Sequence, residues 1–224
     1  MEMTSAAPRL HADNLYRFFR AGDEETLALQ GVTLTVDPGE MVAVNGPSGS
    51  GKSTLLSCLA GVDEPDGGTV RINGERMSHR AETERAALRA RSVGILFQSS
   101  NLFDQLSVRD NILLAQRIAP RSSVDADEIL DEVGLSARRD AYPATLSGGE
   151  SARAGLAVAI ANQPAVLLAD EPTGELDSVT EHQILDLLRR HADTGAAVIV
   201  VTHSEAVVRH ADRSLTLLDG RIAT

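Results

Sequence analysis

Residues 46–54, Gly-Pro-Ser-Gly-Ser-Gly-Lys-Ser-Thr, restrict the fold of this chain more than any other segment. The run Met41–Val44 before them is entirely apolar, which is typical of a strand buried on both faces. The run Leu55–Ala60 after them is mostly apolar and stops at Gly61, a pattern that indicates the opening of a helix. A strand, a glycine-rich loop and a helix in this order indicate a parallel α/β protein.

The loop matches the pattern G-x-x-x-x-G-K-[ST], whose residue types suit phosphate binding. Glycines let successive backbone N–H groups curl around a phosphate, and the helix N-terminus adds partial positive charge. Lys52 supplies a full charge for the β- and γ-phosphates, and the Ser53 hydroxyl can hold Mg²⁺. We therefore expect a nucleotide to bind at Gly46, Pro47, Ser48, Gly49, Ser50, Gly51, Lys52, Ser53 and Thr54.

Composition restricts the class of partner. The chain has 224 residues and a net charge of −11, so nucleic acid is not expected, because neutralising its phosphates requires clustered Lys and Arg. The one basic run, Arg85–Arg91, is interpreted as a solvated helix face. Cys58 is the single cysteine, which excludes an internal disulfide and favours a buried small hydrophobe.

Two absences in the sequence bear on location. No apolar run approaches the ~18 residues that a membrane-spanning helix needs. Residues 1–11 lack a basic region followed by an apolar one, so no secretory signal is expected. A reducing compartment also fits the single cysteine.

Apolar and alternating runs predict strands, and amphipathic runs predict helices, along most of the chain. The expected strand regions are 8–45, 69–76, 93–97, 166–169 and 197–202, followed by a hairpin over 215–222. The expected helices are 80–91 and 181–191, and residues 99–163 are mostly helical in pattern. This order predicts a parallel α/β core with antiparallel strands at the start and a helical insertion in the middle.

Four further motifs follow the phosphate loop, and each places polar residues at the end of an expected strand or the start of an expected helix. They are a strand ending at Gln98, the run Leu146–Glu150 (Leu-Ser-Gly-Gly-Glu), the acidic pair Asp170 and Glu171 continuing through Pro172–Asp177, and a last strand ending at His203. An acidic pair after an apolar strand suits metal binding and general base chemistry.

This set of motifs in this order resembles the ATPase subunit of ATP-binding cassette (ABC) transporters, over essentially the whole chain. The Leu-Ser-Gly-Gly signature distinguishes this family from other phosphate-loop families, which lack it. The resemblance implies one domain over residues 1–224, with a phosphate-loop NTPase core, an N-terminal antiparallel β subdomain and an inserted helical subdomain. Residues 8–98 and 164–224 would form the core with the β subdomain, and residues 99–163 the helical subdomain.

The resemblance assigns chemical roles, with ATP and Mg²⁺ as cofactors. Asp170 is expected to bind Mg²⁺ through water, together with Ser53 and Gln98. Glu171 is expected to polarise the water that attacks the γ-phosphate, which Gln98 also contacts. His203 is expected to donate to the γ-phosphate.

The adenine is expected to stack on an aromatic residue near the N-terminus. Counting against the family pattern puts Phe19 at this position, where tyrosine is more usual. Tyr16 and Phe18 are alternative assignments.

The resemblance also implies that a second subunit completes each site. Ser147, Gly148, Gly149 and Glu150 would close over the ATP held by the partner, with Asp177 at the same interface. The expected assembly is a homodimer, or a pseudo-symmetric dimer with a related ATPase, joined through ATP. Glu150 stands where the family more often has glutamine.

The function implied is an ATP-hydrolysing subunit that powers a separate integral-membrane permease, peripheral on the cytoplasmic face of the cell membrane. Residues 94–111 and 169–178 resemble the subfamily of lipoprotein-release and macrolide-export systems. The alternative is a nucleotide-gated regulatory subunit of a membrane complex that does not itself move solute.

Residues 99–106 carry Leu102, Phe103 and Leu106 in an expected loop. Large apolar residues on a loop either pack inward or meet a partner. Because the segment follows Gln98, movement of Gln98 with the γ-phosphate would reach it. We expect it to be the docking surface for the permease.

Overall fold

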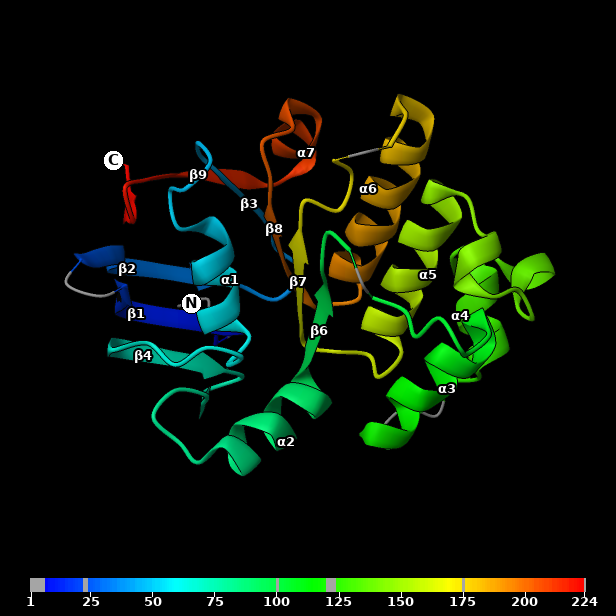
Figure 1. Ribbon diagram of the computed structural model, residues 1–224, viewed down its shortest axis with the longest axis horizontal. Coiled ribbons are helices and arrows are strands. Elements are labelled where there is room, and N and C mark those ends of the chain that lie inside the picture. Colours follow the sequence, from blue (N-terminus) through cyan, green and yellow to red (C-terminus); the bar gives the residue numbers. More distant parts are fainter. Residues whose placement is uncertain (1–6, 22–23, 100, 120–123, 175, 224) are drawn as a thin grey trace, which may run out of the picture.

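The structure, a computed structural model, describes residues 7–21, 24–99, 101–119, 124–174 and 176–223. Ser100 of the expected docking segment and Glu175 of the run after the acidic pair lie outside these residues. Figure 1 shows an antiparallel sheet on the left, a second sheet in the centre and a group of helices on the right.

The first sheet has four strands in the order β2-β1-β4-β5. β1 lies between β2 and β4 and pairs antiparallel with both. Its register with β2 shifts between Arg17 and Phe18, so Ala28 lies opposite no residue of β1 and forms a bulge. The strands are β1 (Leu10–Ala21), β2 (Glu24–Val36), β4 (Gly67–Ile72) and β5 (Glu75–Arg76).

The second sheet has six strands in the order β10-β9-β3-β8-β7-β6. All neighbours from β9 to β6 pair in parallel, so the carboxyl ends of these strands meet at one edge. β9 and β10 form the expected hairpin. The strands are β3 (Met41–Asn45), β6 (Val93–Leu96), β7 (Val166–Asp170), β8 (Ala197–Val201), β9 (Arg213–Leu218) and β10 (Arg221–Ile222).

The central strands are buried on both faces, as their unbroken apolar runs predict. In β3, Val42 and Val44 belong to a core that includes α1 and the first sheet. Met41 and Ala43 face the other way, into a core shared with α3, α4, α5 and α6. Cys58 of α1 is 1% exposed, and burial raises the pKa of its thiol to about 12, which confirms the buried-hydrophobe interpretation.

The helices divide between the two faces of the second sheet. Figure 1 shows α1 between the two sheets, and α3, α4, α5 and α6 grouped beyond β6 and β7. In the part of the chain that the structure describes, none of the helices is long and apolar enough to span a membrane. The helices are α1 (Lys52–Leu59), α2 (Glu82–Ser92), α3 (Val108–Ile118), α4 (Ala126–Glu132), η1 (Ser136–Arg138), η2 (Pro143–Thr145), α5 (Gly148–Ile160), α6 (Ser178–Asp193) and α7 (Glu205–His210).

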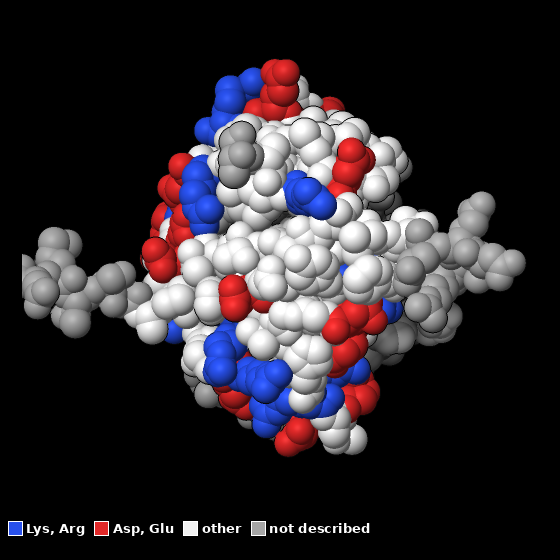
Figure 2. All heavy atoms as spheres, turned by 90° about the vertical axis from the view of Figure 1, so that its left-hand side faces the viewer, with Lys and Arg blue, Asp and Glu red and all other residues white. Residues whose placement is uncertain are grey.

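The interpretation of α2 as a plain solvated face is wrong. The Arg85 side chain is only 13% exposed and pairs with Glu64, at 2.6 Å, and Glu82. Arg89 also pairs with Glu82 and donates to the Gly61 carbonyl. Figure 2 shows the molecule from the left-hand side of Figure 1. Basic and acidic side chains lie next to one another in the lower part of this face. Arg85 and Arg89 of α2 therefore hold the loop after α1.

Candidate active site

A cleft of about 750 Å³ lies at the edge where the parallel strands end. Its walls are the phosphate loop, the residues after β6, β7 and β8, the β9–β10 turn, and parts of β1 and β2. The topology creates it, because loops at the carboxyl edge of a parallel sheet converge. The predicted site residues that line it are Phe19, Gly46, Pro47, Ser48, Gly49, Gly51, Lys52, Ser53, Thr54, Gln98, Asp170, Glu171 and His203.

The phosphate loop lies directly on the neighbouring backbone, which explains two of its glycines. Gly46 (φ 148°) and Gly51 (φ 99°) have left-handed backbone. A Cβ on Gly46 would collide with the carbonyl oxygen of Leu217, and one on Gly51 with that of Ala28. Ser50, which is 2% exposed, accepts a hydrogen bond of 3.0 Å from the Gly220 amide through its carbonyl. The loop is thus seated on β2 and the β9–β10 turn.

Lys52 and the start of α1 concentrate positive charge at this loop. The Lys52 ammonium donates to the carbonyls of Gly46, at 2.8 Å, and Pro47, at 2.9 Å, so it curls back over the loop. The N-cap of α1 is Gly51, and among the described residues no side chain caps this helix end. The first N–H groups of α1 are therefore available to an anion.

Ser53 and Asp170 form the oxygen pair that a cation would need. The Ser53 side chain is hydrogen-bonded to the Asp170 carboxylate, which is half-buried at the end of β7. Burial raises the pKa of Asp170, and the neighbouring Glu171 carboxylate raises it further, whereas Ser53 and Lys52 oppose this shift. A divalent cation would relieve both the burial penalty and the repulsion, and oxygen donors of this kind suit Mg²⁺.

Glu171 is held by the end of β8, a contact that the sequence does not reveal. Its carboxylate accepts hydrogen bonds from the His203 ring at 2.8 Å, the Thr202 hydroxyl at 3.1 Å and the His203 amide at 3.3 Å. The Glu171 side chain is 14% exposed, whereas that of His203 is 72% exposed. The Glu171 carboxylate is thus fixed at the cleft, and the His203 imidazole lies on the solvent side of this carboxylate.

Gln98 lies where the cleft meets a second, smaller one of about 320 Å³. Reciprocal hydrogen bonds of 2.7 and 2.8 Å between Asn101 and the Phe97 backbone hold the turn around Gln98. In the following segment Phe103 is 60% exposed, but Leu102 packs on the helical core. Leu102 is thus partly buried against the helical core and borders the smaller cleft, whereas Phe103 is exposed, and the docking role of this segment stays a prediction.

The signature motif lies at the start of α5, outside the wall of the 750 Å³ cleft. Ser147 and Glu150 form a capping box, in which each side chain accepts from the other's backbone N–H. Gly148 borders the smaller cleft, and a Cβ on Gly149 would lie 2.5 Å from the Thr180 methyl group of α6. Asp177 caps α6 by accepting from the Val179 and Thr180 amides. These residues gather beside one another and away from the phosphate loop of their own chain.

Phe19 is the aromatic residue of β1 that borders the cleft. It is 43% exposed, and the guanidinium carbon of Arg17 lies 4.8 Å from its ring centroid. Tyr16 instead turns toward β2, where its hydroxyl would be 3.1 Å from a Cβ on Gly31. All three candidate aromatic residues are described by the structure. Phe19 lines the cleft, whereas Tyr16 and Phe18 do not.

Comparisons with known proteins give one consistent family. The model of the ABC transporter family matches residues 29–174. The lipoprotein-releasing system ATP-binding protein LolD of Bordetella pertussis is 40% identical over 226 residues, which are 99% of this chain and 98% of that protein. The macrolide export ATP-binding/permease protein MacB of Rhodopirellula baltica is 41% identical over 216 residues, 93% of this chain but 32% of that protein.

Solved structures agree with these relatives. The dimeric ATP-binding cassette MJ0796, in a post-hydrolysis state bound to ADP and Pi, has a TM-score of 0.89 against this chain. The two are 33% identical, and the match covers 96% of this chain and 97% of the other. The predicted fold class is thereby confirmed.

Two glycine substitutions distinguish the effect of a steric clash on ATP binding from the effect of backbone strain. Gly51→Ala should weaken ATP binding about tenfold or more, because the new methyl group must push the loop away from Ala28. Gly74→Ala is the control: its φ of 75° carries a similar strain of about 1–2 kcal/mol, but no atom lies within 4 Å of the added Cβ. Titration with a fluorescent ATP analogue and thermal unfolding compare them; equal affinities would contradict this account of the loop.

Proposed function

This chain belongs to the ABC transporter family as an ATP-binding and ATP-hydrolysing subunit, and we propose that its 750 Å³ cleft holds the MgATP that it consumes. The observation that carries the proposal is the convergence of Lys52, Gln98, Asp170, Glu171 and His203 at one edge of the second sheet. Phosphoryl transfer to water requires positive charge for the phosphates, oxygen ligands for a cation and a fixed carboxylate.

In this assignment the phosphates lie along residues 46–54, within reach of the Lys52 ammonium and the uncapped N–H groups of α1. The Ser53 hydroxyl, the Asp170 carboxylate and the Gln98 amide would hold Mg²⁺, Asp170 through water. When bound, the ion neutralises charge on the phosphate oxygens. The fit is supported by the half-buried Asp170 carboxylate, which lies beside the Ser53 hydroxyl and whose pKa is raised mainly by burial and further by Glu171.

Hydrolysis requires a water oriented toward the γ-phosphate. The Glu171 carboxylate polarises this water as a general base, and Thr202 with the His203 amide keeps it aimed. The His203 ring is exposed and hydrogen-bonded to Glu171. In the presence of ATP it would donate instead to a γ-phosphate oxygen. Gln98 contacts both the ion and the water.

The adenine stacks on Phe19, which the position of this ring at the cleft favours over Tyr16 and Phe18. Such a stack is worth about 0.5–1.5 kcal/mol beyond burial. Adenine therefore contributes less to ATP affinity than the phosphates do.

Each site is completed by a second subunit, either another copy of this chain or a related ATPase. Ser147, Gly148, Gly149 and Glu150 of the partner close over the ATP, with Asp177 nearby. The placement of these residues away from their own phosphate loop supports this, as does the dimeric form of MJ0796. The amides of Gly148 and Gly149, which the capping box does not use, lie at the start of α5 and would offer an anion site.

The other partner is an integral-membrane permease, with this chain peripheral on its cytoplasmic face. MacB, named as an ATP-binding/permease protein and much longer than this chain, supports such a pairing. The permease docks on the surface that follows Gln98, where Phe103 is exposed. Movement of Gln98 with nucleotide state is passed to this surface.

Glu171→Gln should retain ATP binding and lose hydrolysis by about 100-fold or more, because the amide keeps the shape of the side chain but cannot act as a base. Phosphate release and equilibrium binding are the two measurements. Turnover at the wild-type rate would remove Glu171 from the chemical step.

Gly148→Asp should prevent ATP-driven dimerisation through like-charge repulsion with the partner's ATP. Gly148 suits the test better than Gly149, since an added Cβ meets only a Leu176 carbon at 3.9 Å, whereas at Gly149 it meets Thr180. Gly148→Asn, of equal size but neutral, is the control. Light scattering with ATP in a Glu171→Gln background measures the dimer, and normal dimerisation of the Asp variant would contradict the shared site.

Phe103→Asp should leave folding and ATP binding intact and abolish recovery of the membrane protein that co-purifies with the wild-type chain. Phe103 is 60% exposed, so the charge costs little in the isolated protein. Ile118→Asp, at a 66% exposed position at the end of α3, is the matched control. Equal recovery with both variants would place the docking surface elsewhere.

A further inference from the structure

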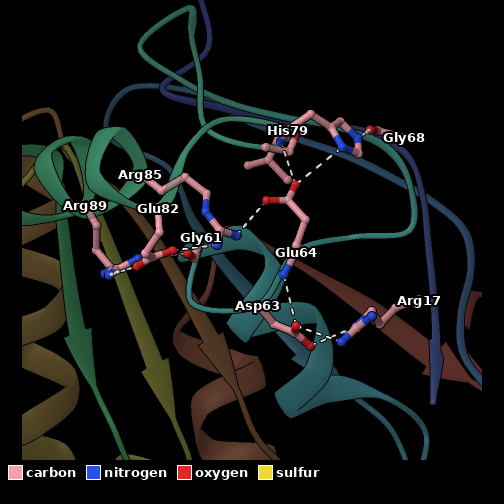
Figure 3. Close-up of polar contacts among 11 residues, drawn as sticks. Arg17, Gly61, Asp63, Glu64, Gly68, His79, Glu82, Arg85 and Arg89 are labelled. Atoms are coloured by element: carbon pink, nitrogen blue, oxygen red, sulfur yellow. Dashed lines mark hydrogen bonds and ion pairs between the residues drawn. The ribbon is translucent and has the colours of Figure 1, made fainter. Parts of the chain in front are cut away.

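Arg17 of β1 is anchored by two carboxylates of the loop that follows α1 (residues 60–66, the anchoring loop). Its Nε and Nη2 donate to the two oxygens of Asp63, each at 2.8 Å, and its Nη1 donates to Asp66 at 3.0 Å. Figure 3 shows Arg17 beside Asp63 at one end of a chain of polar contacts that continues through Glu64 to Arg85. With all three nitrogens bonded, the guanidinium plane has a fixed orientation.

The same loop takes over from β4 as the partner of β1. Pairing of β1 with β4 ends at Tyr16 and Gly67. Next to it, the Asp66 amide donates to the Tyr16 carbonyl at 2.9 Å, and the Phe18 amide donates to the Asp66 carboxylate at 2.8 Å. These contacts support β1 at the register shift that precedes Phe19.

Arg17 is also the immediate neighbour of the Phe19 ring. Residues two apart on a strand share a face, and the guanidinium carbon of Arg17 lies 4.8 Å from the centroid of that ring. Phe19 is 43% exposed and would otherwise sample several rotamers. A cation fixed by two carboxylates limits this freedom and leaves the rest of the ring exposed to the cleft.

The anchoring loop begins at the end of α1, whose other end is the phosphate loop. The Arg17–Asp63 pair therefore joins the aromatic wall of the cleft to the helix that carries Lys52. On its far side the loop is held by α2, through Arg85 to Glu64 and Arg89 to the Gly61 carbonyl (Figure 3). Arg85 supports the same loop without being part of the Arg17–Phe19 contact.

We propose that Arg17 is a positioning residue that holds Phe19 ready to receive the base of the nucleotide. This rests on the proposed function, in which Phe19 stacks on adenine. The role is distinct from phosphate binding and from hydrolysis, because Arg17 touches the ring and the anchoring loop and acts through them.

The test compares two ligands in three variants and the wild-type chain. Arg17→Met should weaken binding of non-hydrolysable ATP about two- to tenfold, the range expected for loss of an oriented stack. Binding of ribose 5′-triphosphate, which has no base, should be unchanged. KM for ATP should rise with kcat nearly constant, and Arg17→Lys should restore part of the loss. Arg85→Met removes the contact of α2 with Glu64 but leaves Arg17 bonded to Asp63 and Asp66, so it should change neither affinity.

A double-mutant cycle gives the decisive comparison. In the Phe19→Ala background, Arg17→Met should have no further effect on ATP affinity, because its target is gone. A full additional loss there, an equal loss for ribose 5′-triphosphate, or the same loss in Arg85→Met would overturn the proposal. If Arg17→Met does not fold, Asp63→Asn takes its place, since it removes one of the two anchoring carboxylates and keeps the cation.

The cycle also separates this inference from the proposed function. Should Phe19→Ala weaken ATP binding while Arg17→Met does not, the positioning role alone is wrong. Should Phe19→Ala leave ATP binding unchanged, the stacking assignment is wrong and the role of Arg17 with it.

Discussion

The seating of the phosphate loop on the junction of the two sheets is the constraint on which the rest of the site depends. Gly51 lies against the Ala28 carbonyl at the β2 bulge, and Gly46 against that of Leu217 at the end of β9. Hydrogen bonds from Gly220 to Ser50 and from Gln30 to Gly220 close the junction. Only residues without a Cβ permit this approach, and it fixes Lys52 relative to both sheets.

The remaining groups reach the loop through the parallel sheet, and their mutual contacts tune them. The ends of β7 and β8 place Glu171 against Thr202 and His203, so the carboxylate that we propose as the general base is oriented before any substrate is present. Asp170, one residue earlier, faces Ser53. On the opposite wall, Arg17 is bonded to the loop after α1 and lies against the Phe19 ring, which is the basis for the positioning role that we propose.

Much of this could be predicted from sequence because apolar runs report burial directly: β3, β7 and β8 and the order of motifs along the chain fix the sheet and its functional edge. What the sequence did not reveal depends on contacts between distant residues. Leu102, expected on a docking surface, is partly buried against the helical core, and Arg85, expected in solvent, is 13% exposed and paired with Glu64. The Glu171–His203 and Arg17–Asp63 pairs lie 32 and 46 residues apart, which no local pattern encodes.

The central claim, that the cleft around Lys52 is the MgATP site, has a direct measurement. Lys52 is the only lysine in the chain, so an amine-selective reagent followed by peptide mass spectrometry reports on this one side chain. MgATP should protect Lys52 from labelling in proportion to occupancy, while adenosine, which lacks phosphates, should protect it little. Equal labelling with and without saturating MgATP would contradict the account.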